Sequence, residues 1–283
     1  MGENDHQLID AAGAAEFPRA AERWVRDAAA YREAAGARAH LDVIYGPRPR
    51  QRLDVFEPAG GASGPIAMFI HGGFWQFMDK SDFSHLARGA NARGVCVAVA
   101  GYTLCPEATI AEIIDEVRGA VAFLAKRYGR PVTVYGHSAG GHLTACLLAT
   151  DLRAFDASLD ASVVPAGLAI SGIFDLEPVL DSPFGPRLRL DAALARRLSP
   201  LFWPAPAGKA MRACVGAAET PEFLRQTRAL VECWRGAGVR IEGAELAGAS
   251  HFAVLDPLTD PQSALTRDLV HLASGLSEPR TAA

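Results

Sequence analysis

Residues 132–143 constrain the fold of this chain more than any other stretch. Residues 132–135 have the β-branched and aromatic character of a strand, and residues 143–150 are rich in alanine and leucine, as in a helix. Between them lies Gly-His-Ser-Ala-Gly, with Ser138 at the tip of a sharp turn. Gly136 and Gly140 fit such a turn because backbones that approach closely leave no room for a Cβ atom. The stretch predicts a strand–turn–helix unit with an exposed serine hydroxyl; a glycine-rich turn that contains serine by chance is the alternative.

Strand-like and helix-like segments alternate along most of the chain. Short apolar runs bounded by turn residues predict strands, and apolar residues at helical spacing predict helices. The alternation is typical of a mostly parallel sheet with helices on both faces, so we expect an α/β fold in one domain spanning residues 1–283. The expected strands are residues 39–45, 52–56, 65–70, 95–100, 132–135, 166–170, 212–215 and 241–246, and the expected helices are residues 81–93, 110–128, 143–150, 221–237 and 260–276.

Three segments stand outside this alternation. Residues 1–37 carry apolar side chains at helical spacing, which predicts an amphipathic helix or two, packed on the domain or covering its site. Residues 176–208 contain several prolines and short apolar pieces, which favour an irregular excursion with short helices, a candidate lid. The tail, residues 277–283, is expected to fray. The apolar residues of the N-terminal segment are Phe17, Ala21, Trp24, Val25 and Ala28.

Composition excludes several classes of partner and cofactor. The formal net charge is −4 and no basic cluster occurs, so neither nucleic acid nor an anionic membrane is an expected partner. Five dispersed cysteines are typical of reduced thiols in a cytosolic protein, and we find neither a signal peptide nor an apolar run as long as a membrane span. Histidine and cysteine spacing fits no metal site, and no phosphate-binding glycine motif occurs. We therefore expect a cytoplasmic protein with no metal and no cofactor.

Four polar residues follow shortly after expected strands: His71, Ser138, Glu219 and His251. In a parallel sheet, functional side chains gather where the carboxyl ends of the strands meet. We therefore expect these residues, which are far apart in sequence, to lie near one another.

A serine hydroxyl needs a base to take its proton and an acid to hold that base in the right tautomer. In α/β-hydrolases the chain order is serine, acid, histidine. His251 and His271 are the histidines beyond the serine and its helix, and His271 falls in the middle of an expected helix. We therefore predict His251 as the base. His137 and His142, which flank the serine, are expected to serve packing and hydrogen bonding.

The acid has two main candidates. Glu219 follows the expected strand that ends at residue 215, and Glu222 lies in the first turn of the next helix. A carboxylate in a first turn is favoured by the helix dipole in any case, and this structural explanation fits Glu222 better. Asp175 and Asp256 are weaker candidates.

The segment His-Gly-Gly-Phe-Trp, residues 71–75, follows an expected buried strand and resembles the loop that donates backbone N–H groups to an oxyanion. The expected donors are the amides of Gly73 and Phe74, with Ala139, the residue after the serine, as the third. His71 is expected to brace this loop by hydrogen bonding.

The chain resembles the kynurenine formamidase (arylformamidase) branch of the α/β-hydrolases. The resemblance rests on residues 45–54, 71–75, 102–107, 136–142 and 215–226 with 248–252. It implies an α/β-hydrolase fold in which Ser138 is the nucleophile, Glu219 the acid and His251 the base. Gly73 and Phe74 would supply oxyanion amides. Glu219 departs from the aspartate that family members often have.

The resemblance also implies an activity: hydrolysis of N-formyl-L-kynurenine to formate and L-kynurenine, in tryptophan breakdown. The alternatives are a small-acyl carboxylesterase and a non-catalytic hydrolase fold used for binding. A complete Ser–Glu–His set argues against the latter. The expected partner is a small aryl formamide or ester, and the sequence leaves open whether the chain forms a homodimer.

Aromatic residues near the predicted site suggest a basis for substrate choice. The ring of Phe74 stands where many esterase loops have a third glycine, and there it would crowd long acyl chains but not a formyl group. Trp75, with Phe77 or Trp203, would stack on an aromatic leaving group. The alternative is that these rings belong to the core, where large aromatic side chains are usually buried.

Overall fold

The central sheet has eight strands in the computed structural model, which describes residues 8 and 10–275. The strands are β1 (Ala39–Ile44), β2 (Arg52–Phe56), β3 (Ile66–Ile70), β4 (Cys96–Ala100), β5 (Val132–His137), β6 (Ala166–Ile170), β7 (Ala210–Gly216) and β8 (Arg240–Leu246). Their order in the sheet is β1-β2-β4-β3-β5-β6-β7-β8. The pairs β1–β2 and β2–β4 are antiparallel and the other pairs are parallel. The expected mostly parallel sheet is confirmed.

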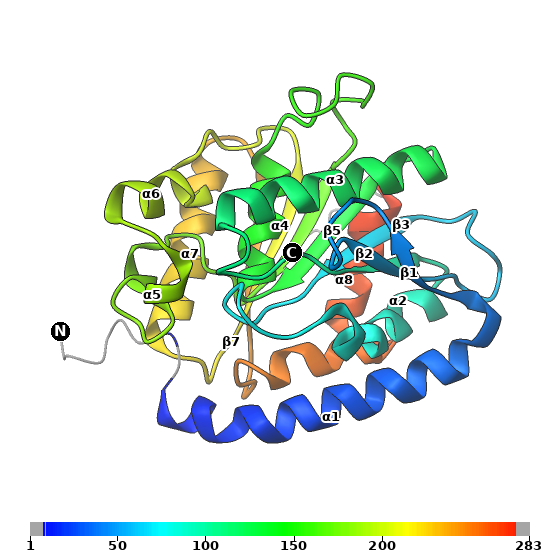
Figure 1. The fold of residues 1–283 in the computed structure, drawn as a ribbon, viewed down its shortest axis with the longest axis horizontal. Coiled ribbons are helices and arrows are strands. Elements are labelled where there is room, and N and C mark those ends of the chain that lie inside the picture. The colour runs from blue at the N-terminus through cyan, green and yellow to red at the C-terminus, as the bar shows by residue number, and fades with distance from the viewer. Residues whose placement is uncertain (1–7, 9, 276–283) are drawn as a thin grey trace, which may run out of the picture.

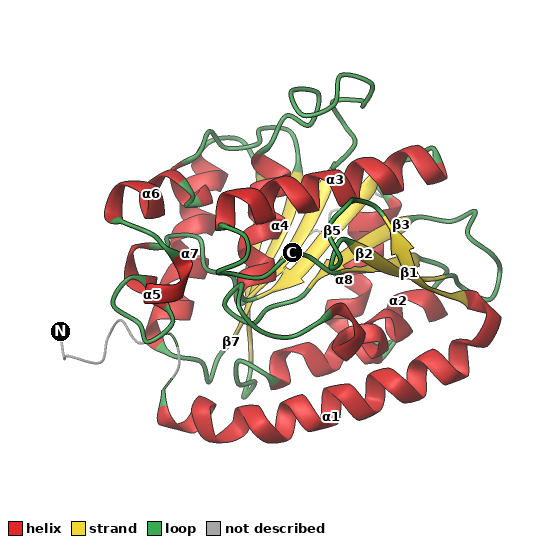
Figure 2. Cartoon of the chain, in the orientation of Figure 1, coloured by secondary structure: helices red, strands yellow, loops and turns green. Residues whose placement is uncertain are grey.

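Helices cover both faces of this sheet (Figure 1). They are α1 (Ala11–Ala35), α2 (Arg88–Ala92), α3 (Ile110–Tyr128), α4 (Ala139–Ala149), α5 (Gly185–Leu188), α6 (Ala192–Arg197), α7 (Pro221–Gly236) and α8 (Ala264–Ser274). Buried side chains of α3, α4 and α7 belong to the hydrophobic cluster of one face, and those of α1, α2 and α8 to that of the other. Figure 2 shows the strands enclosed between these two groups of helices. The expected covering of both faces is also confirmed.

The central strands divide their side chains between the two clusters. In β3, Ile66, Met68 and Ile70 face the cluster that contains α3 and α4. Ala67 and Phe69 face the other cluster, and all residues of the strand are buried. Successive side chains of a strand point to opposite faces, so a strand covered on both faces reads as an unbroken apolar run. This is why β3 and β4 were predictable from short apolar segments.

The N-terminal helix α1 buries one face against the 3₁₀ helix η2 (Lys80–Ala87). Its buried residues are Ala20, Trp24, Ala28, Tyr31 and Ala35. Phe17 and Val25, predicted for the apolar face, are 38% and 49% exposed. For Val25 the prediction was wrong because it lies about 100° around the helix from Trp24.

Three helices differ by several residues from their predicted extents. The helix predicted for residues 143–150 is α4, which begins at Ala139, directly after the serine. Residues 81–93 form η2 and then the short α2. Arg32 of α1 donates to the carbonyl oxygen of Ser81 and to Oγ of Ser84, so this segment is held partly by α1. The last helix begins at Ala264, after a 3₁₀ helix, η5 (Ala253–Thr259). Pro261 disfavours helical geometry at Asp260, where the helix was predicted to begin, and Ser263 caps the N-terminus of the observed helix.

Residues 176–208 form the expected irregular excursion. It contains α5, α6 and two 3₁₀ turns, η3 (Glu177–Val179) and η4 (Pro200–Phe202). Movement of this segment as a lid stays a prediction, and the expected fraying of residues 277–283 falls outside the described residues. No helix within residues 10–275 is both long and apolar enough to cross a bilayer.

Candidate active site

Ser138 lies at a sharp turn between β5 and α4, with φ 56° and ψ −118°. This backbone conformation is rare for a residue with a side chain and is kept only where the surroundings enforce it. The two glycines allow it: a Cβ atom on Gly136 would lie 2.3 Å from the carbonyl oxygen of Gly140, and one on Gly140 would lie 1.9 Å from that of Ile70. The Ser138 amide donates to the carbonyl oxygen of Ile170 at 2.9 Å, which ties the turn to β6.

His251 and Glu219 form a short hydrogen bond, 2.6 Å from Nδ1 to Oε2. The other carboxylate oxygen of Glu219 accepts from Ser171 Oγ at 2.5 Å and from the Gly216 amide at 2.6 Å. The side chain of Glu219 is fully buried, so these bonds replace its hydration. With a carboxylate opposite Nδ1, the imidazole carries its proton there and leaves Nε2 free to accept one. Phe223 stacks on the imidazole with ring centroids 4.3 Å apart.

Ser138 and His251 both line a cavity of about 300 Å³. They follow β5 and β8, and Glu219 follows β7, so the residues meet at the carboxyl ends of parallel strands, as expected. A fourth strand contributes a residue that was not predicted from the sequence: Ser171, directly after β6, which bonds Glu219. The rule that located the other residues would have located Ser171 as well.

The remaining carboxylates considered as the acid lie elsewhere. Glu222 receives two bonds of 2.7 Å from Arg225 and a third from Gln226. The backbone carbonyl of Asp175 accepts from Gln226, and Asp256 pairs with Arg23 of α1 at 2.8 Å.

His137 supports the backbone of the His251 loop. Its Nε2 faces the His251 carbonyl oxygen at 2.8 Å, so it donates there. Burial, followed by the nearby charge of His251, holds the pKa of His137 well below its usual value. A ring that stays neutral and donates to backbone is suited to positioning rather than to proton transfer.

His71 and His142 are buried and each bonds a backbone carbonyl. His71 Nδ1 lies 2.7 Å from the Gly72 oxygen, and its ring stacks on Tyr102 with centroids 4.3 Å apart. His142 Nε2 lies 2.8 Å from the Leu198 oxygen, which anchors the excursion to α4. Burial lowers the pKa of each histidine to about 4.

The loop after β3 has an unusual backbone. Gly73 has φ 105°, and a Cβ atom there would lie 2.5 Å from the Phe77 carbonyl oxygen, so only glycine fits. Phe74 follows with φ 50°. The Gly73 carbonyl accepts from the amides of Gln76 and Phe77 at 2.9 Å each. Among the hydrogen bonds of the described residues, none occupies the amides of Gly73, Phe74 or Ala139.

Phenylalanine rings form much of the cavity wall. Phe74 stacks on Phe184 of the excursion with centroids 4.1 Å apart, and Phe77 meets Phe184 edge-on at 6.0 Å. Phe17 and Trp24 of α1 also line the cavity, so α1 covers the site as well as the domain. The sequence left open whether the N-terminal segment packs on the domain or covers its site, because helical spacing does not identify the surface that a helix covers. Phe184 was not predicted at all.

Two predicted substrate contacts lie away from the cavity. Trp75 is fully buried and meets the ring of His142 at 5.1 Å, as a core residue. Trp203 is half-buried, and its Nε1 donates to the Arg197 carbonyl at 2.8 Å within the excursion. Of the three rings proposed to contact substrate, Phe77 alone lines the cavity.

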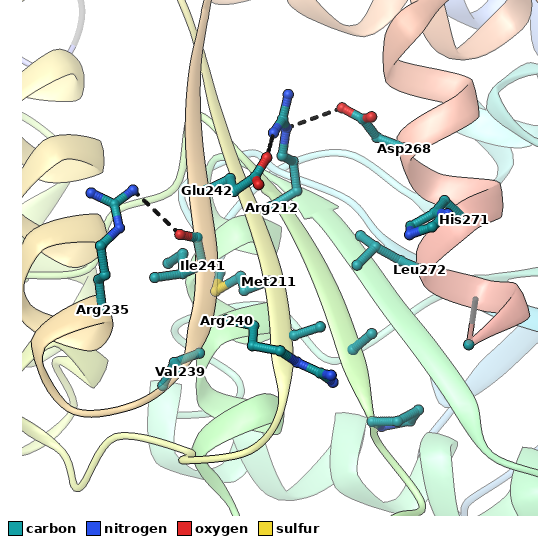
Figure 3. Close-up of a pocket in the computed structure, with 14 residues that line it drawn as sticks. Met211, Arg212, Arg235, Val239, Arg240, Ile241, Glu242, Asp268, His271 and Leu272 are labelled. Atoms are coloured by element: carbon teal, nitrogen blue, oxygen red, sulfur yellow. Dashed lines mark hydrogen bonds and ion pairs between the residues drawn. The ribbon is translucent and has the colours of Figure 1, made fainter. Parts of the chain in front are cut away.

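A larger cavity, about 570 Å³, lies at the opposite edge of the sheet, beside the first residues of β7 and β8 and α8 (Figure 3). Its charged side chains pair with one another or with backbone: Arg212 lies between Glu242 and Asp268, and Arg235 donates to a carbonyl of β8. His271 lies here, far from Ser138. Within the described residues, no group of histidine, cysteine and carboxylate side chains is arranged to hold a metal ion.

Comparisons with known proteins agree with this architecture. The family model described as BD-FAE matches residues 53–181. A kynurenine formamidase from Danio rerio is 28% identical over 240 residues, which cover 82% of this chain and 81% of the relative. An isoprenylcysteine alpha-carbonyl methylesterase of Oryza sativa, named as probable, is 31% identical over 150 residues, 49% of this chain and 36% of the relative.

A solved structure from Silicibacter sp. TM1040, which carries a provisional thioesterase description, superimposes with a TM-score of 0.78. It is 34% identical, and the match covers 94% of this chain and 96% of that one. Similarity at this level over nearly the whole of both chains, together with the formamidase match, identifies the family. The chain belongs to the kynurenine formamidase branch of the α/β-hydrolase superfamily.

Proposed function

We propose that this hydrolase cleaves N-formyl-L-kynurenine to formate and L-kynurenine through a formyl-enzyme intermediate. The observation that carries the proposal is the 2.6 Å bond from His251 to Glu219, with His251 and Ser138 facing one cavity. A serine, a histidine with a free Nε2 and a buried carboxylate behind it are the parts that acyl transfer requires.

In the first half-reaction, Ser138 Oγ attacks the formyl carbon while His251 Nε2 takes the hydroxyl proton. Glu219 stabilises the imidazolium that forms. The oxyanion accepts hydrogen bonds from the amides of Gly73, Phe74 and Ala139, which no other described group occupies. His251 then gives its proton to the aniline nitrogen as the C–N bond breaks, and kynurenine departs.

In the second half-reaction, His251 takes a proton from water, and the hydroxide adds to the formyl carbon. The bond to Ser138 Oγ breaks, the serine recovers its proton from His251, and formate leaves. The same groups act in both halves, so no cofactor is needed.

Two features support a formamide rather than a long-chain ester. The relatives matched over most of the chain include kynurenine formamidases. The Phe74 ring, 5% exposed and stacked on Phe184, limits the room beside its own amide. A formyl group has only hydrogen beyond its carbonyl carbon and fits that restriction.

A small-acyl carboxylesterase is the second candidate, favoured by the similarity of half of the chain to isoprenylcysteine methylesterases. The same residues would perform the same steps, with an alkoxide as the leaving group. The two candidate functions therefore differ in substrate and not in catalytic residues.

The test compares kcat/KM for N-formyl-L-kynurenine and p-nitrophenyl acetate on purified protein, with Ser138→Ala as the control. We expect the formamide to react, and the variant to lose activity on both substrates by on the order of 10³-fold or more at unchanged stability. Hydrolysis of the ester without the formamide would favour the carboxylesterase. Substantial turnover by a stably folded Ser138→Ala would exclude Ser138 as the nucleophile.

A further inference from the structure

The loop at residues 71–79 has a strained backbone. Gly73, Phe74, Trp75 and Met78 have positive φ angles of 105°, 50°, 56° and 74°. Residues with side chains keep such conformations only where the surrounding structure enforces them. The amides of Gly73 and Phe74, which face the oxyanion in the proposed reaction, lie inside this stretch. Their direction therefore depends on the contacts that hold the loop from outside.

The segment at residues 102–105 holds the loop at its start and in its middle. The Tyr102 hydroxyl donates to the carbonyl oxygen of His71 at 2.9 Å. The Cys105 amide donates to the carbonyl oxygen of Trp75 at 2.7 Å. Neither bond reaches the end of the loop, so a further contact has to fix Met78.

Arg50 supplies that contact. Its Nη2 donates to the carbonyl oxygen of Met78 at 2.7 Å and pairs with the Asp79 carboxylate at 3.1 Å. Its Nε donates to the carbonyl oxygen of Tyr102 at 2.9 Å. One planar guanidinium thus joins the end of the loop to the segment that holds its start and middle. Arg50 itself does not line the cavity of Ser138, so it can influence the reaction only through this loop.

The backbone that carries Arg50 is itself fixed. Arg50 lies in the connection between β1 and β2, and this connection packs on Gly101, directly after β4. A Cβ atom on Gly101 would lie 2.7 Å from the Arg50 carbonyl oxygen, and the Tyr45 hydroxyl donates to the Gly101 oxygen at 2.6 Å. The Arg50 side chain is 29% exposed, and its guanidinium has the planar fork of donors that a lysine ammonium lacks.

We propose that Arg50 is a positioning residue for the oxyanion. By holding Met78 and Tyr102 together, it keeps the amides of Gly73 and Phe74 directed at the oxygen on which negative charge develops. The inference rests on the proposed function, because that reaction passes through an oxyanion. Donors that stabilise such a charge act by being held in place before the reaction.

The first test is steady-state kinetics of Arg50→Ala and Arg50→Lys. A displacement of about 1 Å in a catalytic group can cost about 10²-fold in rate. We expect kcat to fall by on the order of 10²-fold in Arg50→Ala and about 10-fold in Arg50→Lys, with KM within about threefold of wild type, because the lost interaction belongs to the transition state. Wild-type kcat in either folded variant, or a raised KM at unchanged kcat, would overturn the inference.

Arg130 provides a matched control. Its guanidinium also joins two carbonyl oxygens, those of Ala62 and Gly64, but it lies just before β5, whereas Ser138 follows that strand. Arg130→Ala should lower the thermal unfolding temperature and leave kcat and KM unchanged. A similar loss of kcat in Arg130→Ala would show that general destabilisation accounts for the effect, and the inference would fall.

Inhibitor binding separates positioning of the oxyanion amides from a change in the whole cavity. Phenylboronic acid adds to a serine hydroxyl and gives a tetrahedral adduct, whereas 2-aminoacetophenone resembles the leaving amine and forms no adduct. In Arg50→Lys, the inhibition constant of the boronic acid should rise in proportion to the fall in kcat. That of 2-aminoacetophenone should change by less than about threefold. Equal changes for both inhibitors would contradict a role confined to the oxyanion.

Failure of the proposed function gives a different pattern. If wild type hydrolyses p-nitrophenyl acetate but not N-formyl-L-kynurenine, the formamidase proposal is wrong. Ester kinetics of the Arg50 variants then decide the inference, because ester hydrolysis also develops an oxyanion. If wild type hydrolyses both substrates and the Arg50 variants keep their kcat, the inference about Arg50 alone is wrong.

Discussion

The Glu219 carboxylate is held from three directions. His251 bonds one oxygen, and Ser171 and the Gly216 amide bond the other. A buried carboxylate with this many donors has little freedom to rotate, so the imidazole opposite it is fixed in orientation and tautomer. We infer that the extra length of glutamate is accommodated by the donors behind it.

Replacing Glu219 with glutamine should therefore lower kcat by on the order of 10³–10⁴-fold, because an amide can present its NH₂ group to His251 and favour the wrong tautomer. The matched control is Glu222→Gln, three residues along the chain. Glu222 bonds Arg225 and Gln226, so its loss should affect stability more than kcat. Steady-state kinetics on both variants, with thermal unfolding, is the measurement; the opposite pattern would assign the acid to Glu222.

For single residues, the sequence was informative where a reactive side chain also stands at a position typical of a functional site. Ser138, Glu219 and His251 were located because each is a reactive residue placed just after a strand. Trp75 and Trp203 were misassigned because an apolar ring is equally acceptable in the core and in a pocket, and spacing does not distinguish the two. Phe184 was missed for the same reason.

At the scale of elements, α1 is both a packing helix and a wall of the cavity. Its Phe17 lines the cavity and contacts Phe252 with ring centroids 5.5 Å apart, although it is 38% exposed. Ala14 and Trp24 of the same helix line the cavity too. The contact with Phe252 joins α1 to the residue directly after His251.

Truncating Phe17 to alanine should raise KM for aryl substrates several-fold with little change in thermal stability, because a half-exposed ring contributes more to the cavity than to the core. Val25→Ala is the control: Val25 lies on the same helix, is 49% exposed and does not line the cavity. The measurements are KM for aryl substrates and thermal unfolding, made on both variants. Equal effects on KM would show that α1 acts only through packing.

The Phe74 loop should set the limit on acyl length. Phe74 has φ 50°, a conformation that glycine adopts readily, so Phe74→Gly can remove the ring without straining the backbone. We expect wild type to prefer acetyl over octanoyl p-nitrophenyl esters, and the variant to gain more on longer chains than on formyl substrates. A chain-length series that includes N-formyl-L-kynurenine measures this. A wild-type preference for octanoyl would show that the ring does not restrict the acyl side.

Element boundaries were predictable where local signals agree. The helix at residues 110–128 matches its predicted extent because Thr109 and Glu112 form a capping box at its start and Gly129 ends it in the left-handed conformation. Boundaries were not predictable in the segments at residues 81–93 and 253–263. Residues 80–87 (η2) and 253–259 (η5) are 3₁₀ helices, which helical periodicity does not distinguish from α-helix; η2 packs against α1, and η5 contains Pro257.

For the whole molecule, the sheet order explains how distant residues converge. β5, β6, β7 and β8 are adjacent and parallel, so Ser138, Ser171, Glu219 and His251 follow the same edge of the sheet in sequence order. Alternation of strands and helices predicts this arrangement. It does not predict which of the covering segments close the cavity, because that depends on contacts between distant surfaces such as α1 and Phe252.

The described structure also buries several histidines in neutral form. Burial lowers the pKa of His71, His85 and His142 from a usual value of 6.5 to about 4, and it also holds the pKa of His137 well below 6.5. Between pH 6.5 and pH 4 the unfolded chain therefore binds more protons than the folded one. The free energy of unfolding must fall as the pH falls through this range, by up to about 1.4 kcal/mol per pH unit for each histidine.

His85 offers the cleanest test because it lies in η2, outside the cavity. His85→Gln removes one titrating group, so its free energy of unfolding should fall less steeply than that of wild type between pH 6.5 and pH 4, by up to about 1.4 kcal/mol per pH unit. Urea unfolding of both proteins at a series of pH values measures the two slopes. The difference between the two slopes reports His85 alone, because the carboxylates that titrate in the same pH range are present in both proteins. Identical slopes would mean that His85 does not stay neutral in the folded protein.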